Sequence, residues 1–268
     1  MDLTITKEEF ESVLYVATSK HMEVFESVQP HIENATEDCI EEFFGSFSTD
    51  NAKVIKCAKD YICVDAFLLV FRQLDLVLTP TGFGVVSNQT TSPASKQRVD
   101  ALETQLRLIR EKVKARLINR LTSTEDWGKT EAAKRCIRTV FYSISLFERY
   151  ATTPVSFESW QEAQIQIMEA DMKLRTKISD AQMDRILESV RNGTAAADYS
   201  SIIWHLQMFF SLYIAHSPLI GERMRIIIVT MEANPETYKE YMESDAYKIN
   251  HYEPYKNKKD SPAFFFAG

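Results

Sequence analysis

The chain has 268 residues, of which 45% are hydrophobic and 26% charged, so it is neither a disordered nor a collagen-like polypeptide. A chain of 30.9 kDa buries roughly 70% of its unfolded surface and needs no metal or disulfide to fold. Its 7 Gly and 8 Pro are too few for the many turns of an all-β fold, and its net charge of −7 disfavours a general nucleic-acid binder.

The first part of the sequence predicts three consecutive helices. Apolar residues recur at helical spacing from Phe10 to Val28, and Pro30 is expected to interrupt this pattern. A second helical run ends at Gly45, and Asp50 is the predicted N-cap of a third helix. The third helix is apolar nearly all round, so we expect it at the centre of its domain.

A small β-hairpin and a long helix complete the predicted N-terminal half, residues 1–127. Short β-prone runs on either side of a Pro-Thr-Gly sequence place the hairpin near residues 76–87. Apolar residues then recur at steps of three and four over residues 95–122, with Ser92 or Ser95 as the helix cap. A helix of this length extends for about 40 Å.

The predicted C-terminal half spans residues 128–233. Residues 199–221 carry no formal charge and are long enough to cross a bilayer. However, Ser, Gln, His and Pro residues interrupt this stretch and no basic cluster flanks it, so we expect a core helix. The predicted helices cover residues 136–150, 157–177, 180–191 and 198–215.

The two halves show short matches that suggest an internal duplication. The sequence Phe-Glu-Ser occurs at residues 10–12 and 157–159, and Gly45 and Asp50 have counterparts in Gly193 and Asp198. The alternative is that such short matches arise by chance between helical segments. In either case the sequence predicts a mainly α fold, a multi-helix bundle of two helical halves with one small β-hairpin.

Residues 234–268 are predicted to form a C-terminal helix and an extended arm. Asn234 is the expected cap of this helix, with Pro235 at its first position, and the arm begins after Asn250. Three consecutive aromatic residues near the end of the arm follow a polar, basic stretch. Because leaving them in water costs about 2 kcal/mol each, we expect them to dock on a protein surface. They are Phe264, Phe265 and Phe266.

The sequence contains no motif that predicts catalysis, a cofactor or a metal. The four cysteines lack CxxC spacing and the histidines are scattered, so we interpret the cysteines as buried, reduced thiols of a cytoplasmic protein. The opening residues are acidic and lack the apolar run of a secretory signal, so we expect synthesis in the cytoplasm. An enzyme stays open as an alternative if distant carboxylates converge, such as Asp60 or Asp65 with Asp75.

Charge is unevenly distributed along the chain. Residues 1–95 hold 6 Lys and Arg against 15 Asp and Glu, whereas residues 96–138 hold 12 against 6. The long helix should therefore present a basic face that includes Arg107, Arg110 and Lys114. Three interpretations remain: a solvated face, contact with nucleic-acid phosphates, or contact with the acidic N-terminal region of another copy.

Two segments resemble a known family. The sequence LDLVLTPTGFGVVSNQTTSPASKQRVDAL, from Leu74 to Leu102, and the closing YKNKKDSPAFFF are similar to an uncharacterised family encoded by gut bacteria and their resident phages. Some of its members lie among virion morphogenesis genes. The order of helices and flap is also broadly similar to phage head-to-tail connector proteins, a similarity of fold only. The resemblance implies a role in virion assembly and no catalytic residues.

We therefore expect a non-enzymatic structural assembly subunit, a connector-type component of a phage or prophage virion. It would associate with itself or with other virion proteins, without membrane or cofactor, and would be cytoplasmic until it joins a virion. The alternative is a nucleic-acid-associated factor that uses the basic face of the long helix.

Overall fold

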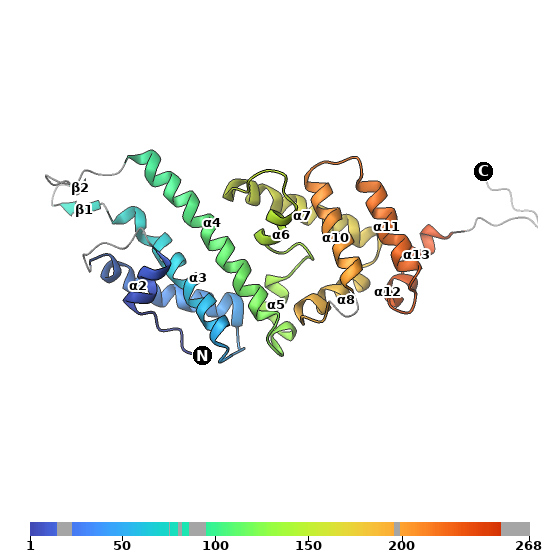
Figure 1. Ribbon diagram of the computed structural model, residues 1–268, viewed down its shortest axis with the longest axis horizontal. Helices are drawn as coiled ribbons and strands as arrows, with labels where there is room; N and C mark the ends of the chain where they lie inside the picture. Colours follow the sequence, from blue (N-terminus) through green and yellow to red (C-terminus); the bar gives the residue numbers. More distant parts are fainter. Residues whose placement is uncertain (15–22, 75, 80–81, 86–94, 196–198, 253–268) are drawn as a thin grey trace, which may run out of the picture.

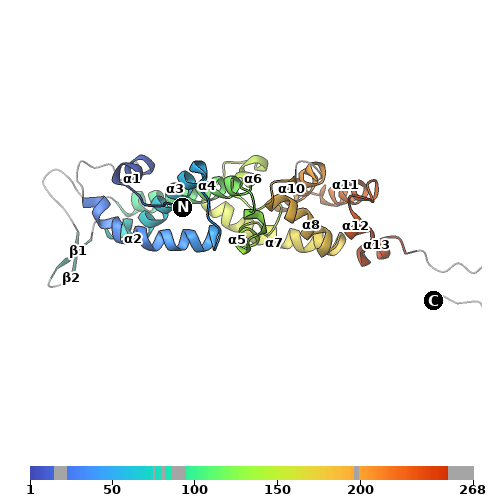
Figure 2. The ribbon, with the colours of Figure 1, turned by 90° about the horizontal axis from the view of Figure 1, so that it is seen from below.

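A computed structural model of the protein describes residues 1–14, 23–74, 76–79, 82–85, 95–195 and 199–252. The fold is mainly α, as predicted, and its helices form an elongated array (Figure 1). Figure 2 shows two layers along the long axis, with α2 and α7 on one side and α1, α6 and α10 on the other. The α-helices are α1 (Lys7–Val13), α2 (Glu23–Cys39), α3 (Ala52–Val70), α4 (Lys96–Leu121), α5 (Glu131–Cys136), α6 (Ile144–Tyr150), α7 (Phe157–Lys177), α8 (Asp180–Arg191), α10 (Ser200–Ile214), α11 (Ile220–Glu232), α12 (Lys239–Met242) and α13 (Asp245–Asn250).

Helix α2 continues through Pro30, so the prediction that this proline interrupts the helix was wrong. The exposed position of Pro30 places its ring on the solvent side of the helix. At its end α2 passes into a π-helical turn, η2 (Ile40–Phe44), closed by a 2.7 Å bond from the Gly45 amide to the Ile40 carbonyl. The wider turn buries Phe43 and Phe44 together, although they are consecutive.

Helix α3 is the centre of the N-terminal half, as its apolar sequence predicted. It packs against α1, α2 and α4. Its N-cap is Asn51 rather than the predicted Asp50, because the Asn51 side chain accepts bonds from the Lys53 and Val54 amides. Either side chain can cap a helix, and the sequence did not distinguish the two neighbours.

Two four-residue strands, β1 (Leu76–Thr79) and β2 (Gly82–Val85), follow the short 3₁₀ turn η3 (Phe71–Gln73). They pair antiparallel, with Leu76 opposite Val85. The connecting residues 80–81 and the following residues 86–94 lie outside the described residues. In the described part of the chain the two short strands pair only with each other, and the helices determine that the fold is mainly α.

The predicted boundary between the two halves, at residues 127 and 128, is a packed junction. Trp127 starts the short 3₁₀ turn η4 (Trp127–Lys129), its ring is fully buried, and its Nε1 donates to the Phe43 carbonyl at 2.7 Å. Arg135 and Cys136 donate to the neighbouring Glu41 and Glu42 carbonyls. Residues 127–136 therefore satisfy three carbonyls at the end of η2 that the π turn leaves unpaired.

The junction also brings the backbones of the two halves into contact. A Cβ atom at Gly193 would lie 2.5 Å from the carbonyl oxygen of Thr122 in the N-terminal half. Within the C-terminal half, a Cβ atom at Gly128 would lie 2.5 Å from the Arg191 carbonyl oxygen. Gly193 also has a positive φ of 68°. These glycines permit a close approach that no other residue allows. One hydrophobic core cluster includes residues from both halves.

In the C-terminal half, two of the predicted helices are confirmed, and a third is present as two shorter helices. Helices α7 and α8 have the predicted bounds. The helix predicted over residues 136–150 is instead α5 and α6, separated by a stretch that buries Ile137, Val140 and Phe141. Ser143 caps α6 with a bond to the Leu146 amide, which restarts the helix there.

Helix α10 contains most of the uncharged stretch, and its exposed residues are Ser200, Ser201 and Trp204. Ile202, Leu206 and Phe209 are buried, whereas Trp204 is 49% exposed. Among the described residues, no helix combines the length and apolar character that a membrane crossing requires. The expectation of a core helix is therefore confirmed, with Trp204 on its exposed side.

The final helices differ from the prediction. Residues 235–237 form a turn, so Pro235 does not start a helix, and α12 begins at Lys239. Tyr241 fixes α12 to α8, because its amide donates to the buried Gln182 side chain at 3.2 Å. The predicted arm after Asn250 lies outside the described residues from residue 253 on.

The Phe-Glu-Ser match does not mark equivalent positions. Phe10 is a buried residue within α1, whereas Phe157 is the first residue of α7. Gly45 and Gly193 do correspond, because both follow a helix with positive φ. The internal duplication stays a prediction.

The four cysteines are free thiols in the structure. Cys39 and Cys63 are buried, as predicted, whereas Cys57 and Cys136 are only half-buried. Burial raises the pKa of all four thiols, that of Cys136 to about 11 and that of Cys63 to about 12.

We expect native-state alkylation to modify Cys57 and Cys136 before the two buried cysteines. Because the thiolate is the reacting species, the rate at Cys136 should rise about tenfold per pH unit between pH 7 and 9. Iodoacetamide labelling followed by peptide mass spectrometry measures both effects. Equal labelling of Cys39 and Cys57 in the folded protein would contradict the burial described here.

Candidate interaction surface

The cations predicted to form a basic face on α4 meet acidic residues of the same chain. Arg110 donates to Asp65 of α3 at 2.9 Å, and Lys114 donates to Glu42 of η2 at 2.5 Å. Burial acts to lower the pKa of Lys114, but the charge and hydrogen bond of Glu42 outweigh it and the pKa is raised. Lys114 therefore stays positively charged. We call the ion pairs that α4 makes with η2, α3 and η3 the ionic seam.

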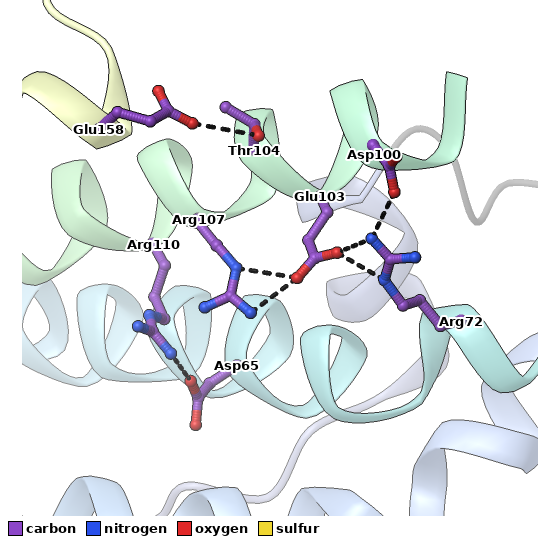
Figure 3. A network of polar contacts seen from close by, with 8 residues as sticks. All are labelled: Asp65, Arg72, Asp100, Glu103, Thr104, Arg107, Arg110 and Glu158. Carbon is purple, nitrogen blue, oxygen red and sulfur yellow. Dashed lines mark hydrogen bonds and ion pairs between the residues drawn. The ribbon is translucent and has the colours of Figure 1, made fainter. Parts of the chain in front are cut away.

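Figure 3 shows how the seam continues toward the start of α4. Glu103 accepts bonds from Arg107, one turn further along α4, and from Arg72 of η3. Arg72 also donates to Asp100 at 2.7 Å. The hydrogen bonds from Arg107 and Arg72 hold the pKa of Glu103 below its ordinary value, so this carboxylate stays charged. Arg72 thereby fixes the end of α3 to α4.

The predicted charge complementarity is thus present within one chain. Arg107, Arg110 and Lys114 all have carboxylate partners, so phosphate binding at this face would first require breaking these pairs. The cations of α4 without an ion pair among the described residues lie nearer its ends; they are Lys96, Arg98, Arg116 and Arg120. The nucleic-acid interpretation gains no support from this arrangement.

We expect the Arg110–Asp65 pair to be coupled in a double-mutant cycle. Both side chains are largely buried, at 28% and 14% exposure, so Arg110→Ala should lower the free energy of unfolding by about 2–3 kcal/mol, with a coupling energy of about 1 kcal/mol to Asp65→Ala. Urea unfolding measures all four proteins. The exposed Lys134–Glu131 pair is the matched control, with an expected coupling below about 0.5 kcal/mol. Equal coupling in the two pairs would show that the seam adds no stability.

A cleft of about 560 Å³ lies between α4 and α7. Arg110 and Lys114 line it from α4, and Trp160 and Met168 line it from α7. Trp160 is itself tied to α4, because its Nε1 donates to Glu111 at 3.2 Å. The volume of the cleft is within the range of pockets that bind small molecules or a partner's side chains. Further lining residues are Glu42, Arg135, Arg138, Tyr142, Phe157 and Ile167.

Helix α7 exposes an apolar stripe beside this cleft. Ile165, Met168 and Met172 are 61%, 57% and 68% exposed. Their spacing of three and four residues places them on one helix face. The opposite face of α7 is the buried one, through Trp160, Ala163, Ile167, Ala170 and Leu174. We call the stripe and the adjoining cleft, which share Met168, the α7 groove.

The sequence prediction did not include the α7 groove. The sequence predicted a helix over residues 157–177, but the exposed apolar series Ile165, Met168 and Met172 was not recognised in it. A helix with one buried face needs only one such series. Apolar residues on both faces were therefore the available signal for a contact surface.

The other predicted site residues are not brought together. Asp65 pairs with Arg110, Asp60 pairs with Lys56, and Asp75 lies outside the described residues. Within the described ranges, no group of three or more His, Cys, Asp or Glu residues is placed to hold a metal ion. Phe264, Phe265 and Phe266 also lie outside the described residues.

Residues 28–137 match a protein family described as "Family of unknown function (DUF6712)". The matched segment runs from within α2 to the residue after α5, so it contains the ionic seam and the carbonyl contacts of the junction. No curated protein and no solved structure matches the chain significantly. The match marks α2 to α5 as a unit shared with other proteins and does not include α7.

Proposed function

We propose that this protein is a non-enzymatic structural assembly subunit, a connector-type component of a phage or prophage virion. The observation that carries the assembly role is the distribution of exposed apolar side chains. Eight of the nine large hydrophobic side chains that the described residues expose lie from α7 onward. Three of them form the stripe of the α7 groove. A contiguous exposed apolar stripe of this kind is typical of a protein contact site.

The proposed mechanism is apolar association of copies, closed by docking of Phe264, Phe265 and Phe266 on a neighbouring chain. The sequence alone favoured charge complementarity between copies. The ionic seam occupies those charges within one chain, and therefore favours apolar contacts as the main driving force. The virion setting rests on the resemblance of residues 74–102 and of the closing segment. It implies a cytoplasmic protein that becomes part of a virion.

Absolute mass measurement by light scattering tests this proposal. We expect a closed oligomer at micromolar concentration that persists at high salt, since apolar contacts are not screened. Dissociation by salt would instead favour charge-driven association. Deletion of residues 261–268 should shift the mass toward the monomer. A strict monomer of 30.9 kDa at every concentration would overturn self-assembly.

A further inference from the structure

We propose that the α7 groove is the receptor for residues 256–266 of a second copy of this chain. This inference rests on the proposed assembly function and names the surface on which the closing segment docks. The groove combines an apolar stripe that the described residues leave uncovered with a cleft lined by aromatic side chains. The proposed occupant combines three phenylalanines with three lysines.

The apolar part of the groove suits aromatic side chains. Met168 and Met172 supply flexible thioethers, which adapt to aromatic rings and make favourable sulfur–aromatic contacts. Met168 lies at the boundary with the cleft, where Phe157 and Trp160 form part of the wall. A ring that packs on Met168 can therefore enter the cleft. Three adjacent phenylalanines can contact the stripe and the cleft together.

Charge sets the direction of the occupant. The stripe is bordered on α7 by the exposed Glu162 and by Glu169, which also accepts a hydrogen bond from the Tyr213 hydroxyl. The cleft beside the stripe is lined instead by cations, which would repel lysines; they are Arg110, Lys114, Arg135 and Arg138. In the sequence, Lys256, Lys258 and Lys259 precede the phenylalanines. Opposite charges beside an apolar contact fix the register of two surfaces. We therefore place the lysines beside the glutamates and the phenylalanines on the methionines.

The distances along the two segments agree. From Glu162 to Met172 the helix rises about 15 Å, at 1.5 Å per residue. From Lys259 to Phe264 an extended chain spans about 17 Å. Eleven residues lie between Tyr252 and Phe264, and the chain from one to the other reaches about 40 Å when extended. This reach allows the segment to cross from one copy to its neighbour.

Photo-cross-linking of the full-length protein tests the contact directly. A benzoylphenylalanine placed at Phe265 in isotopically heavy protein, mixed with light protein, should cross-link to the peptide that holds Ile165 to Met172 of the light copy. Cross-links to that peptide within the same copy would show that the segment binds its own chain. Cross-links to other peptides would show a different receptor. Either result overturns the proposal.

Groove variants give an independent measurement. Ile165→Glu together with Met172→Glu should weaken assembly at least tenfold, whereas Leu69→Glu, at a 50% exposed apolar position on α3, should not change it. Circular dichroism and urea unfolding confirm that each variant is folded. Glu162→Lys should also weaken assembly, and Lys259→Glu in the same chain should restore it.

The two proposals fail in different ways. A wild-type protein that remains a monomer removes the assembly function and this inference with it. A protein that assembles, but whose groove variants assemble as tightly as the wild type, retains the assembly function and loses the α7 receptor.

Discussion

Replacing Trp127 with alanine is expected to lower the free energy of unfolding by about 3–5 kcal/mol. The ring is fully buried at the junction, and its Nε1 donates to the Phe43 carbonyl at 2.7 Å. The substitution removes the largest buried side chain of the described core and leaves that carbonyl without this donor. Urea unfolding followed by circular dichroism measures the loss.

Two further variants separate the causes. Trp127→Phe keeps most of the apolar volume but loses the bond to Phe43, so we expect a loss of about 1–3 kcal/mol. Trp204→Ala is the matched control, because Trp204 is 49% exposed and its ring stacks against Arg223 on the surface. Its effect should stay below about 1 kcal/mol. If Trp204→Ala costs as much as Trp127→Ala, the junction is not the stabilising feature.

Replacing Gly193 with alanine should destabilise the protein by about 2–5 kcal/mol. Two costs combine at this position. Its φ of 68° is left-handed, which costs a non-glycine residue about 1–2 kcal/mol. The new Cβ would also lie 2.5 Å from the Thr122 carbonyl oxygen, and relieving that overlap requires a backbone shift that costs about 1–3 kcal/mol.

Gly45 provides a control that shares only the first cost. Its φ is 59°, and no atom lies within 4 Å of the position a Cβ would occupy. Gly45→Ala should therefore cost about 1–2 kcal/mol, and the difference between the two variants measures the contact between the halves. Thermal or urea unfolding of both variants gives this difference. Equal effects would mean that the chain relaxes at Thr122 without cost.

Much of the fold was predictable because local sequence determined it. The stepwise apolar spacing of α7 and α8, together with the Ser156 and Ser179 caps, fixed both helices at the predicted residues. The break between α5 and α6 was missed because its apolar residues, such as Val140 and Phe141, are buried by tertiary packing in a non-helical segment. Helical spacing alone does not reveal such a segment.

The candidate surface was harder to predict than the fold. The sequence identified Arg107, Arg110 and Lys114, but it could not show that Asp65 and Glu42 lie opposite two of them. These partners are 45 and 72 residues away in the chain. Pairing over such separations is set by how α3 and η2 pack on α4. A cluster of like charges on one helix is therefore weak evidence for an external partner when the rest of the chain carries the opposite charge.

The backbone contact at Gly193 and Thr122 also has a mechanical consequence. Hinge residues absorb changes in φ and ψ, and a glycine such as Gly193 can do so, but here its backbone lies so close to the Thr122 carbonyl that even a Cβ atom would be 2.5 Å from the oxygen. We therefore expect this contact to restrict bending between the N-terminal helices and the end of α8, so that the elongated array of Figure 1 moves largely as one body. If copies assemble into a ring, as proposed above, its diameter would then follow the length of the subunit, and a change of shape would occur between subunits.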